Sequence, residues 1–215
     1  MNKEKETRTL SIELRSAEDR TIEGRAIVFN SLSQDMGFRE QILPEAITED
    51  VLNNSDIFML YNHNLDRGYL ARANKGKGSL KIDIREDGVY FSFIAPHTAL
   101  AEEVREHMLA GDLNKCSFAF TVASDTWEKN GNDYLRTINK IDRLYDLSLV
   151  DSPAYMATSC KCARFDEILA EEKAEAEKKM AELREQEEAK LAEYYKSLKE
   201  EYKKYPKQKI YKTNQ

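Results

Sequence analysis

The chain has three histidines, and histidine is the side chain best suited to accept and return a proton near neutral pH. His107 lies within an amphipathic helical pattern, and His97 lies in the turn before it. His63 differs, because it follows the apolar run 57–61 and lies in a polar loop. A histidine at the end of a rigid strand is well placed for acid and base chemistry, although an ordinary surface position is the alternative interpretation.

Ser117 is the candidate partner of His63, and the alternating pattern around it predicts a strand. On such a strand Cys116, Phe118, Phe120 and Val122 would face the core, and Ser117, Ala119 and Thr121 would face the other side. We therefore expect an accessible hydroxyl with small neighbours, as a nucleophilic serine requires beside an imidazole. A serine that merely faces solvent is the alternative, and this segment alone does not exclude it.

A carboxylate that orients the imidazole would complete the set, and the segment 138–150 offers two. Asp146 lies in an apolar stretch, where a buried carboxylate needs a partner such as an imidazole N–H. Asp142 lies four residues earlier, on the same expected face of the strand. At this level either aspartate could orient His63.

Other site chemistries are poorly supported by the sequence. Cys116, Cys160 and Cys162 are an odd and sparse set, which argues against a disulfide framework and for reduced thiols. Cys160 and Cys162 supply at most half of a metal site, because no second pair has structural-zinc spacing. A Gly-x-Ser-x-Gly nucleophile elbow, typical of esterases, is absent. We expect neither metal nor cofactor.

The elements that would position these residues are mostly strands. Short β-branched and aromatic runs separated by turn residues fill the chain from residue 9 to about 155 and predict a mostly antiparallel β domain. The clearest runs are residues 10–14, 22–29, 57–61, 80–84, 89–94, 117–122 and 134–150. Helices are expected at 44–52 and 98–109, the second with Leu100, Val104, Met108 and Leu109 on its apolar face.

The composition changes after Tyr155, and residues 165–205 lack Gly and Pro, which predicts one long helix. Its apolar residues recur every eleven positions, in the rows Leu169, Met180, Leu191, Tyr202 and Leu183, Tyr194, Tyr205. We interpret it as a docking or self-association helix, with a solvated helix as the alternative. The predicted domains are residues 1–157 and 158–215, the second ending in a disordered tail.

The balance of charge and hydropathy excludes several partners. The 33 basic and 39 acidic residues give a formal net charge of -6 without a basic cluster, so direct nucleic-acid binding is not expected. No apolar stretch is long enough for a membrane span, and the charged N-terminus is unlike a signal peptide. We expect a protein that stays in the cytoplasm where it is made.

Three motifs, in order along the chain, resemble those of the prohead proteases of tailed bacteriophages. They are Leu60-Tyr61-Asn62-His63, then Ser117-Phe118-Ala119-Phe120, then the run from Ile141 to Val150 followed by Pro153-Ala154-Tyr155. Ala119 stands where many relatives have glycine. The resemblance covers residues from about 9 to 155.

This resemblance implies an α+β, mostly β fold: an antiparallel β-barrel flanked by helices, as in the herpesvirus assembly proteases, here with the long C-terminal helix appended. It implies His63 as base, Ser117 as nucleophile and Asp146 as the acid, with Asp142 still possible. Arg143, close to these aspartates in sequence, is a candidate electrostatic helper, with a surface salt bridge as the alternative. The herpesvirus enzymes have a histidine in the third position, so the acid does not transfer from them.

The implied activity is a serine endopeptidase that cuts capsid precursor or scaffold proteins, and itself, inside the assembling prohead in the host cytoplasm. The alternative is a catalytically inert capsid-assembly scaffold that works through its C-terminal helix.

Overall fold

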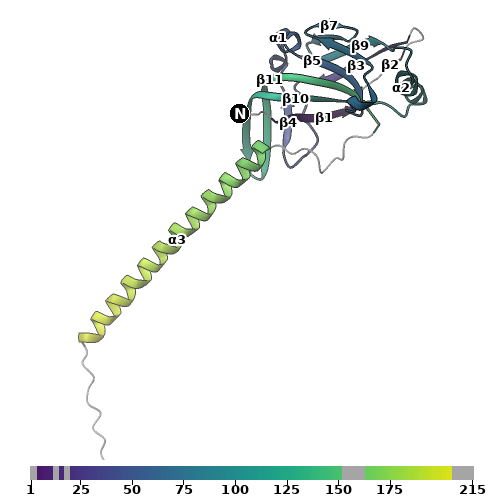
Figure 1. Cartoon of the computed structure of the whole chain (residues 1–215). Helices are drawn as coiled ribbons and strands as arrows, with labels where there is room; N and C mark the ends of the chain where they lie inside the picture. Colours follow the sequence, from purple (N-terminus) through teal and green to yellow (C-terminus); the bar gives the residue numbers. More distant parts are fainter. Residues whose placement is uncertain (1–3, 12–14, 17–19, 152–162, 205–215) are drawn as a thin grey trace, which may run out of the picture. The chain divides into compact units, whose positions relative to one another are not determined.

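A computed structural model describes residues 4–11, 15, 16, 20–151 and 163–204 (Figure 1). The chain divides into two compact units, residues 1–161 and 162–215. The strands are β1 (Glu6–Ser11), β2 (Arg15–Ser16), β3 (Thr21–Val28), β4 (Arg39–Ile42), β5 (Asp56–Tyr61), β6 (Ala71–Asn74), β7 (Lys77–Gly78), β8 (Lys81–Arg85), β9 (Gly88–Ile94), β10 (Lys115–Asn130) and β11 (Asp133–Val150). The helices are η1 (Pro44–Ala46), α1 (Glu49–Asn53), η2 (Leu65–Arg67), α2 (Ala99–Ala110) and α3 (Ala163–Lys204).

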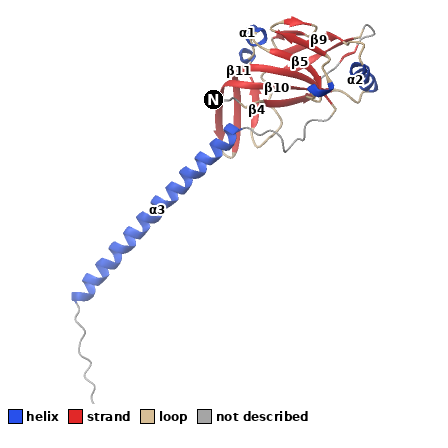
Figure 2. Cartoon of the chain, in the orientation of Figure 1, coloured by secondary structure: helices blue, strands red, loops and turns tan. Residues whose placement is uncertain are grey.

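The strands of the first unit form two sheets (Figure 2). The seven-stranded sheet has the order β1-β10-β11-β5-β6-β7, with β4 also paired to β11, and the four-stranded sheet has the order β2-β3-β9-β8. β11 runs parallel to β4 and to β5, whereas the other pairs are antiparallel. The seven-stranded sheet is therefore mixed, the four-stranded sheet is antiparallel, and the fold is α+β.

The expected closed antiparallel barrel is not what the described strands form. β1 and β7 end one sheet and β2 and β8 end the other, so no pairing among the described strands closes a barrel. The sequence could not reveal this difference, because hydrophobic alternation fixes which face of a strand is buried but not its direction or its neighbour.

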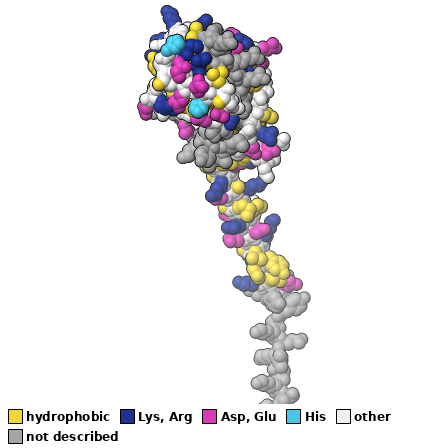
Figure 3. All heavy atoms as spheres, turned by 90° about the vertical axis from the view of Figure 1, so that its right-hand side faces the viewer, with side chains coloured by type: hydrophobic (Ala, Val, Ile, Leu, Met, Phe, Trp, Pro, Cys, Tyr) yellow, Lys and Arg dark blue, Asp and Glu magenta, His cyan; other side chains and the backbone are white. Residues whose placement is uncertain are grey.

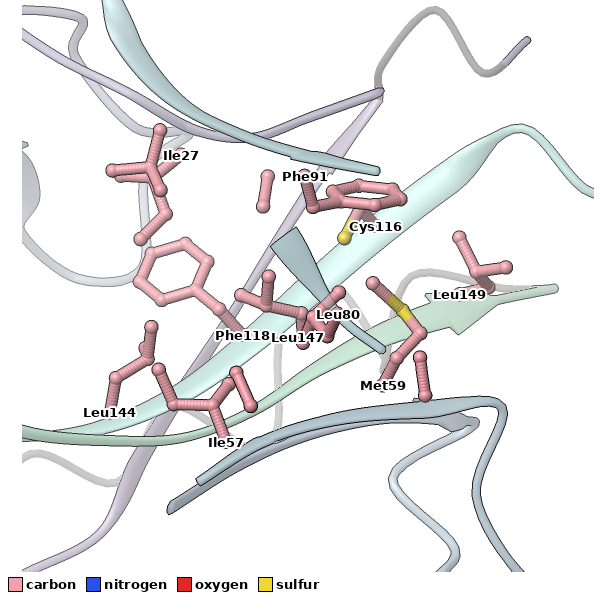
Figure 4. Close-up of a cluster of buried hydrophobic side chains, with 14 of the residues drawn as sticks. Ile27, Ile57, Met59, Leu80, Phe91, Cys116, Phe118, Leu144, Leu147 and Leu149 are labelled. Atoms are coloured by element: carbon pink, nitrogen blue, oxygen red, sulfur yellow. The ribbon is translucent and has the colours of Figure 1, made fainter. Parts of the chain in front are cut away.

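The core lies between the two sheets. Figure 4 shows Ile57, Met59, Cys116, Phe118, Leu144, Leu147 and Leu149 from the seven-stranded sheet meeting Ile27 and Phe91 from the four-stranded sheet. On β10, Cys116, Phe118 and Phe120 face this core, as the alternation predicted, and Val122 packs against its margin. This row of buried side chains anchors the strand that carries Ser117.

A buried ion network ties the edge strand β1 to the rest of its sheet. The Arg8 guanidinium donates to Glu6 at 2.7 Å and to both oxygens of Glu40 at 2.7 and 2.8 Å. Arg136 donates to both of these glutamates and, through Nε, to Asp125 at 2.7 Å. The charges lie almost entirely out of water, so each relies on its partners.

The two predicted helices of the first unit differ in outcome. The helix expected at 44–52 is split into η1 and α1, because Ile47 and Thr48 have extended backbone. α2 matches its prediction: the Thr98 side chain accepts from Ala101 N–H, and Gly111 ends the helix with φ 82°. Of its expected apolar face, Leu100, Val104 and Met108 pack against the core, but Leu109 is exposed.

The second unit contains the predicted long helix, α3. Apolar and charged side chains are interspersed along its surface (Figure 3). Of the expected rows, Leu169, Met180, Leu183, Leu191 and Tyr194 are exposed. Tyr202 and Tyr205 lie outside the residues whose side chains the structure describes, as does the expected tail.

Candidate active site

His63 is positioned by the parallel pairing of β5 with β11, in which Leu60 lies beside Ser148. Where β5 ends, Asn62 N–H donates to the Leu149 carbonyl at 2.9 Å. Asn62 and His63 both adopt left-handed backbone, with φ of 53° and 55°. Asparagine and histidine are among the residues that tolerate this conformation best. The resulting sharp turn directs His63 away from the course of the strand.

Ser117 lies on β10, flanked by Thr9 of β1 and by Ser148 of β11. Its Oγ lies 2.6 Å from His63 Nε2 and 2.9 Å from the carbonyl oxygen of Arg8. The expectation that Ser117 has an open face is wrong, because only 1% of the residue is exposed. Alternation assigns Ser117 correctly to the face opposite the core, but this face is itself covered around the serine.

Asp146 stands on β11 opposite Ala119, with 3% of the residue exposed. Its Oδ1 lies 2.5 Å from His63 Nδ1, and its Oδ2 accepts from Lys5 Nζ at 3.2 Å. Asp142 is exposed. Of the two aspartates that the sequence left open, Asp146 is therefore the one in contact with the imidazole.

The environment of Asp146 favours its charged form. Burial is the largest single influence, and alone it would raise the pKa of this carboxyl. Three neighbours outweigh it: His63 donates a hydrogen bond and attracts the charge, Lys5 attracts the charge, and Ser148 donates a hydrogen bond. Together they lower the pKa below its ordinary value. A carboxylate facing Nδ1 requires the Nδ1–H tautomer of a neutral imidazole. The lone pair of Nε2 then faces Ser117.

Cys116, next to Ser117 in sequence, is the other nucleophilic side chain on this part of β10. It is fully buried on the core face, and burial raises the pKa of its thiol to about 12. The reactive thiolate is therefore scarce near neutral pH. The arrangement favours oxygen rather than sulfur as the nucleophile.

Three contributors to the site were not predicted. Ser148 Oγ donates to Asp146 at 2.9 Å and lies 3.1 Å from His63 Nδ1. Ser148 is part of the last motif, two residues after Asp146, and alternation with period two places both residues on the same face of the strand. No pattern in the sequence pointed to Lys5 or to the Arg8 carbonyl, because only the pairing of β1 with β10 brings this part of the chain to the site.

The other residues singled out by the sequence take no part in the side-chain contacts described above. His97 and His107 are exposed, with side-chain exposures of 84% and 45%. Arg143 is exposed on β11 opposite Thr121, and Ala119 is fully buried opposite Asp146.

Neither a metal cluster nor a membrane helix appears in the parts of the chain that the structure describes. No group of three or more potential ligands gathers there, and Cys160 and Cys162 lie outside these residues. Likewise, no described helix is long and apolar enough to cross a bilayer.

The pairing of an imidazole with a buried serine and a buried aspartate is the arrangement of a serine hydrolase. The family model of the Caudovirus prohead serine proteases matches residues 7–179, from β1 into α3, and the chain belongs to this family. It is thus a phage serine protease that processes capsid proteins during head maturation.

Among solved structures, the bacteriophage T4 capsid assembly protease gp21 is similar, with 13% sequence identity and a TM-score of 0.39 over 70% of this chain and 99% of that one. No curated protein matches the sequence significantly.

Proposed function

We propose that Ser117 is the nucleophile, His63 the general base and Asp146 the orienting acid of this protease. The observation that carries the proposal is the unbroken contact from Ser117 Oγ to His63 Nε2 at 2.6 Å and from His63 Nδ1 to Asp146 Oδ1 at 2.5 Å. The residues come from three different strands or strand ends, and both short contacts have the polarity that proton transfer needs.

The chemistry follows from these contacts. Ser117 Oγ attacks the scissile carbonyl carbon while its proton passes to His63 Nε2. The proton then moves to the leaving amine as the peptide C–N bond breaks, which leaves an acyl-enzyme ester on Ser117. Water attacks this ester, His63 accepts the water proton and returns it to Ser117 Oγ, and the product acid is released. Throughout, the charge of Asp146 stabilises the imidazolium that forms.

The substrates in this proposal are capsid precursor and scaffold proteins, and the enzyme itself, inside the assembling prohead. Residues 1–157 form the catalytic domain, and residues 158–215 mediate docking or self-association. Support for a separate second role comes from α3, whose Leu169, Met180 and Leu191 lie one above another at eleven-residue spacing and are all exposed.

The test uses the chain co-expressed with its capsid precursor, with new N-termini read by mass spectrometry. Ser117→Ala and His63→Asn should both abolish cleavage; asparagine is chosen because it suits the left-handed backbone at residue 63. Ser124→Ala, on the exposed part of β10, and His97→Ala are matched controls and should cleave normally. Cleavage at the parent rate by either folded site variant would overturn the assignment.

A further inference from the structure

Ser148 is a fully buried polar residue in the middle of the seven-stranded sheet. It lies on β11 between Ser117 of β10 and Leu60 of β5, so it stands directly between the two strands that carry the nucleophile and the base. A buried hydroxyl needs hydrogen-bonding partners, and the Ser148 hydroxyl finds them in His63 and Asp146 of the active site.

The hydroxyl of Ser148 has one proton and two lone pairs to distribute. It accepts the backbone N–H of His63 at 3.2 Å and donates to Asp146 Oδ1 at 2.9 Å. If its proton pointed instead to His63 Nδ1, that nitrogen would be unprotonated and would face the carboxylate at 2.5 Å as a second acceptor. Two acceptors at this distance repel each other, so the Ser148 hydroxyl donates its proton to Asp146.

Both groups that Ser148 holds have other conformations open to them. His63 has left-handed backbone, which is unfavourable for a residue with a Cβ and persists only where surrounding contacts favour it. Asp146 can rotate about its side-chain bonds, and Lys5, its other charged neighbour, is half exposed and therefore a loose anchor. A single rigid hydroxyl contacts both groups at once.

We propose that Ser148 is a positioning residue that locks the His63 backbone and the Asp146 carboxylate into one geometry, and so fixes the imidazole tautomer and its direction toward Ser117. This inference rests on the proposed catalytic roles of Ser117, His63 and Asp146. This role requires no contact between Ser148 and the reacting bond. Its influence passes entirely through the imidazole and the carboxylate.

The chain offers a matched control in Ser55. This serine is also buried, at 1% exposure, and also bridges two groups: it donates to the Val51 carbonyl at 2.6 Å and accepts from Leu144 N–H at 3.2 Å. Its partners lie outside the active site. Ser55→Ala therefore reports what the loss of a buried serine costs in stability alone.

The experiment compares Ser148→Ala with Ser55→Ala in full-length protein acting on purified capsid precursor. We expect Ser148→Ala to lower kcat by about 10- to 100-fold, since small misplacements of catalytic groups cost this much, with KM within about twofold of the parent. Ser55→Ala should lower thermal stability by a similar amount but leave kcat near the parent value. Ser148→Thr, which restores the hydroxyl, should recover part of kcat.

Imidazole nitrogen NMR supplies a second readout. The parent should show His63 protonated at Nδ1, with the resonance assigned by its loss in His63→Asn, and Ser148→Ala should show a mixture of tautomers. If Ser148→Ala does not fold, Ser148→Cys replaces it under the same expectations, because sulfur nearly preserves the volume but is a poor hydrogen-bonding group.

The outcomes separate this inference from the function on which it rests. If Ser117→Ala is inactive while folded Ser148→Ala keeps the parent kcat and tautomer, Ser148 is only structural and the positioning role is wrong. If Ser117→Ala retains full cleavage, the catalytic assignment itself fails.

Discussion

The carbonyl oxygen of Arg8 lies 2.9 Å from Ser117 Oγ, so the edge strand β1 offers a second acceptor for the one proton of the serine. The first acceptor is His63 Nε2, at 2.6 Å. Donation to Arg8 and donation to His63 are alternatives, and only the second draws the proton toward the base. The Arg8 carbonyl of β1 thus competes with His63 for the proton of Ser117.

Substitution of the two aspartates of β11 should slow cleavage by very different amounts. Asp146→Asn should lower the cleavage rate by about 10⁴-fold, the cost of losing the acid in a well-studied serine protease. Asp142→Asn should change it by about twofold or less, because Asp142 is exposed. Rates on the capsid precursor measured side by side decide the matter, and the reverse ranking would transfer the role to Asp142.

The pKa of Asp146, lowered by its partners, predicts how the stability of the fold depends on pH. Its contribution to stability is complete above the ordinary pKa of 3.8 and is lost as the pH falls through the lower pKa of the folded state. Below that ordinary value, the free energy of unfolding should therefore fall more steeply for the parent than for Asp146→Asn. Urea titrations at a series of acidic pH values measure both slopes. Parallel slopes would show that Asp146 is not stabilised by its neighbours.

Because of the buried ion network around β1, the loss of a single arginine should destabilise the fold. Arg136→Met removes a partner of both Glu6 and Glu40 and leaves their charges undercompensated in the interior. We expect a loss of about 3 to 5 kcal/mol in the free energy of unfolding, as is usual for a broken buried ion pair. Arg85→Met, which breaks an exposed pair with Asp83, is the control and should cause a much smaller loss in the same urea titration. Equal losses in the two variants would contradict the importance of the network.

The helix α3 should be dispensable for peptide-bond cleavage but required for entry into the head. A chain truncated after Lys161, where the two compact units divide, should cleave capsid precursor in solution yet be missing from purified proheads. Confinement raises the local concentration of substrate, which gives a capsid protease a reason to carry such a segment. Immunoblots of purified proheads give the measurement. Normal incorporation of the truncated chain, or its failure to fold, would refute this division of labour.

The sequence by itself determined the local structure and the residue types of the site. Alternation located the core face of β10, and the Thr98 cap and Gly111 stop located α2, because capping and burial patterns act over a few neighbouring residues. The composition of residues 165–205 predicted α3 almost to its observed ends. His63 and Ser117 stood out because of what precedes and surrounds them in the chain.

Only the tertiary structure decided which residues meet. His63 and Asp146 are 83 positions apart in sequence, and their contact depends on the parallel pairing of β5 with β11, which no periodicity encodes. The same is true of Lys5, whose ammonium reaches Asp146 across 141 positions. Strand direction, strand neighbours and the burial of Ser117 arise from packing between distant segments. Only the tertiary structure therefore reveals them.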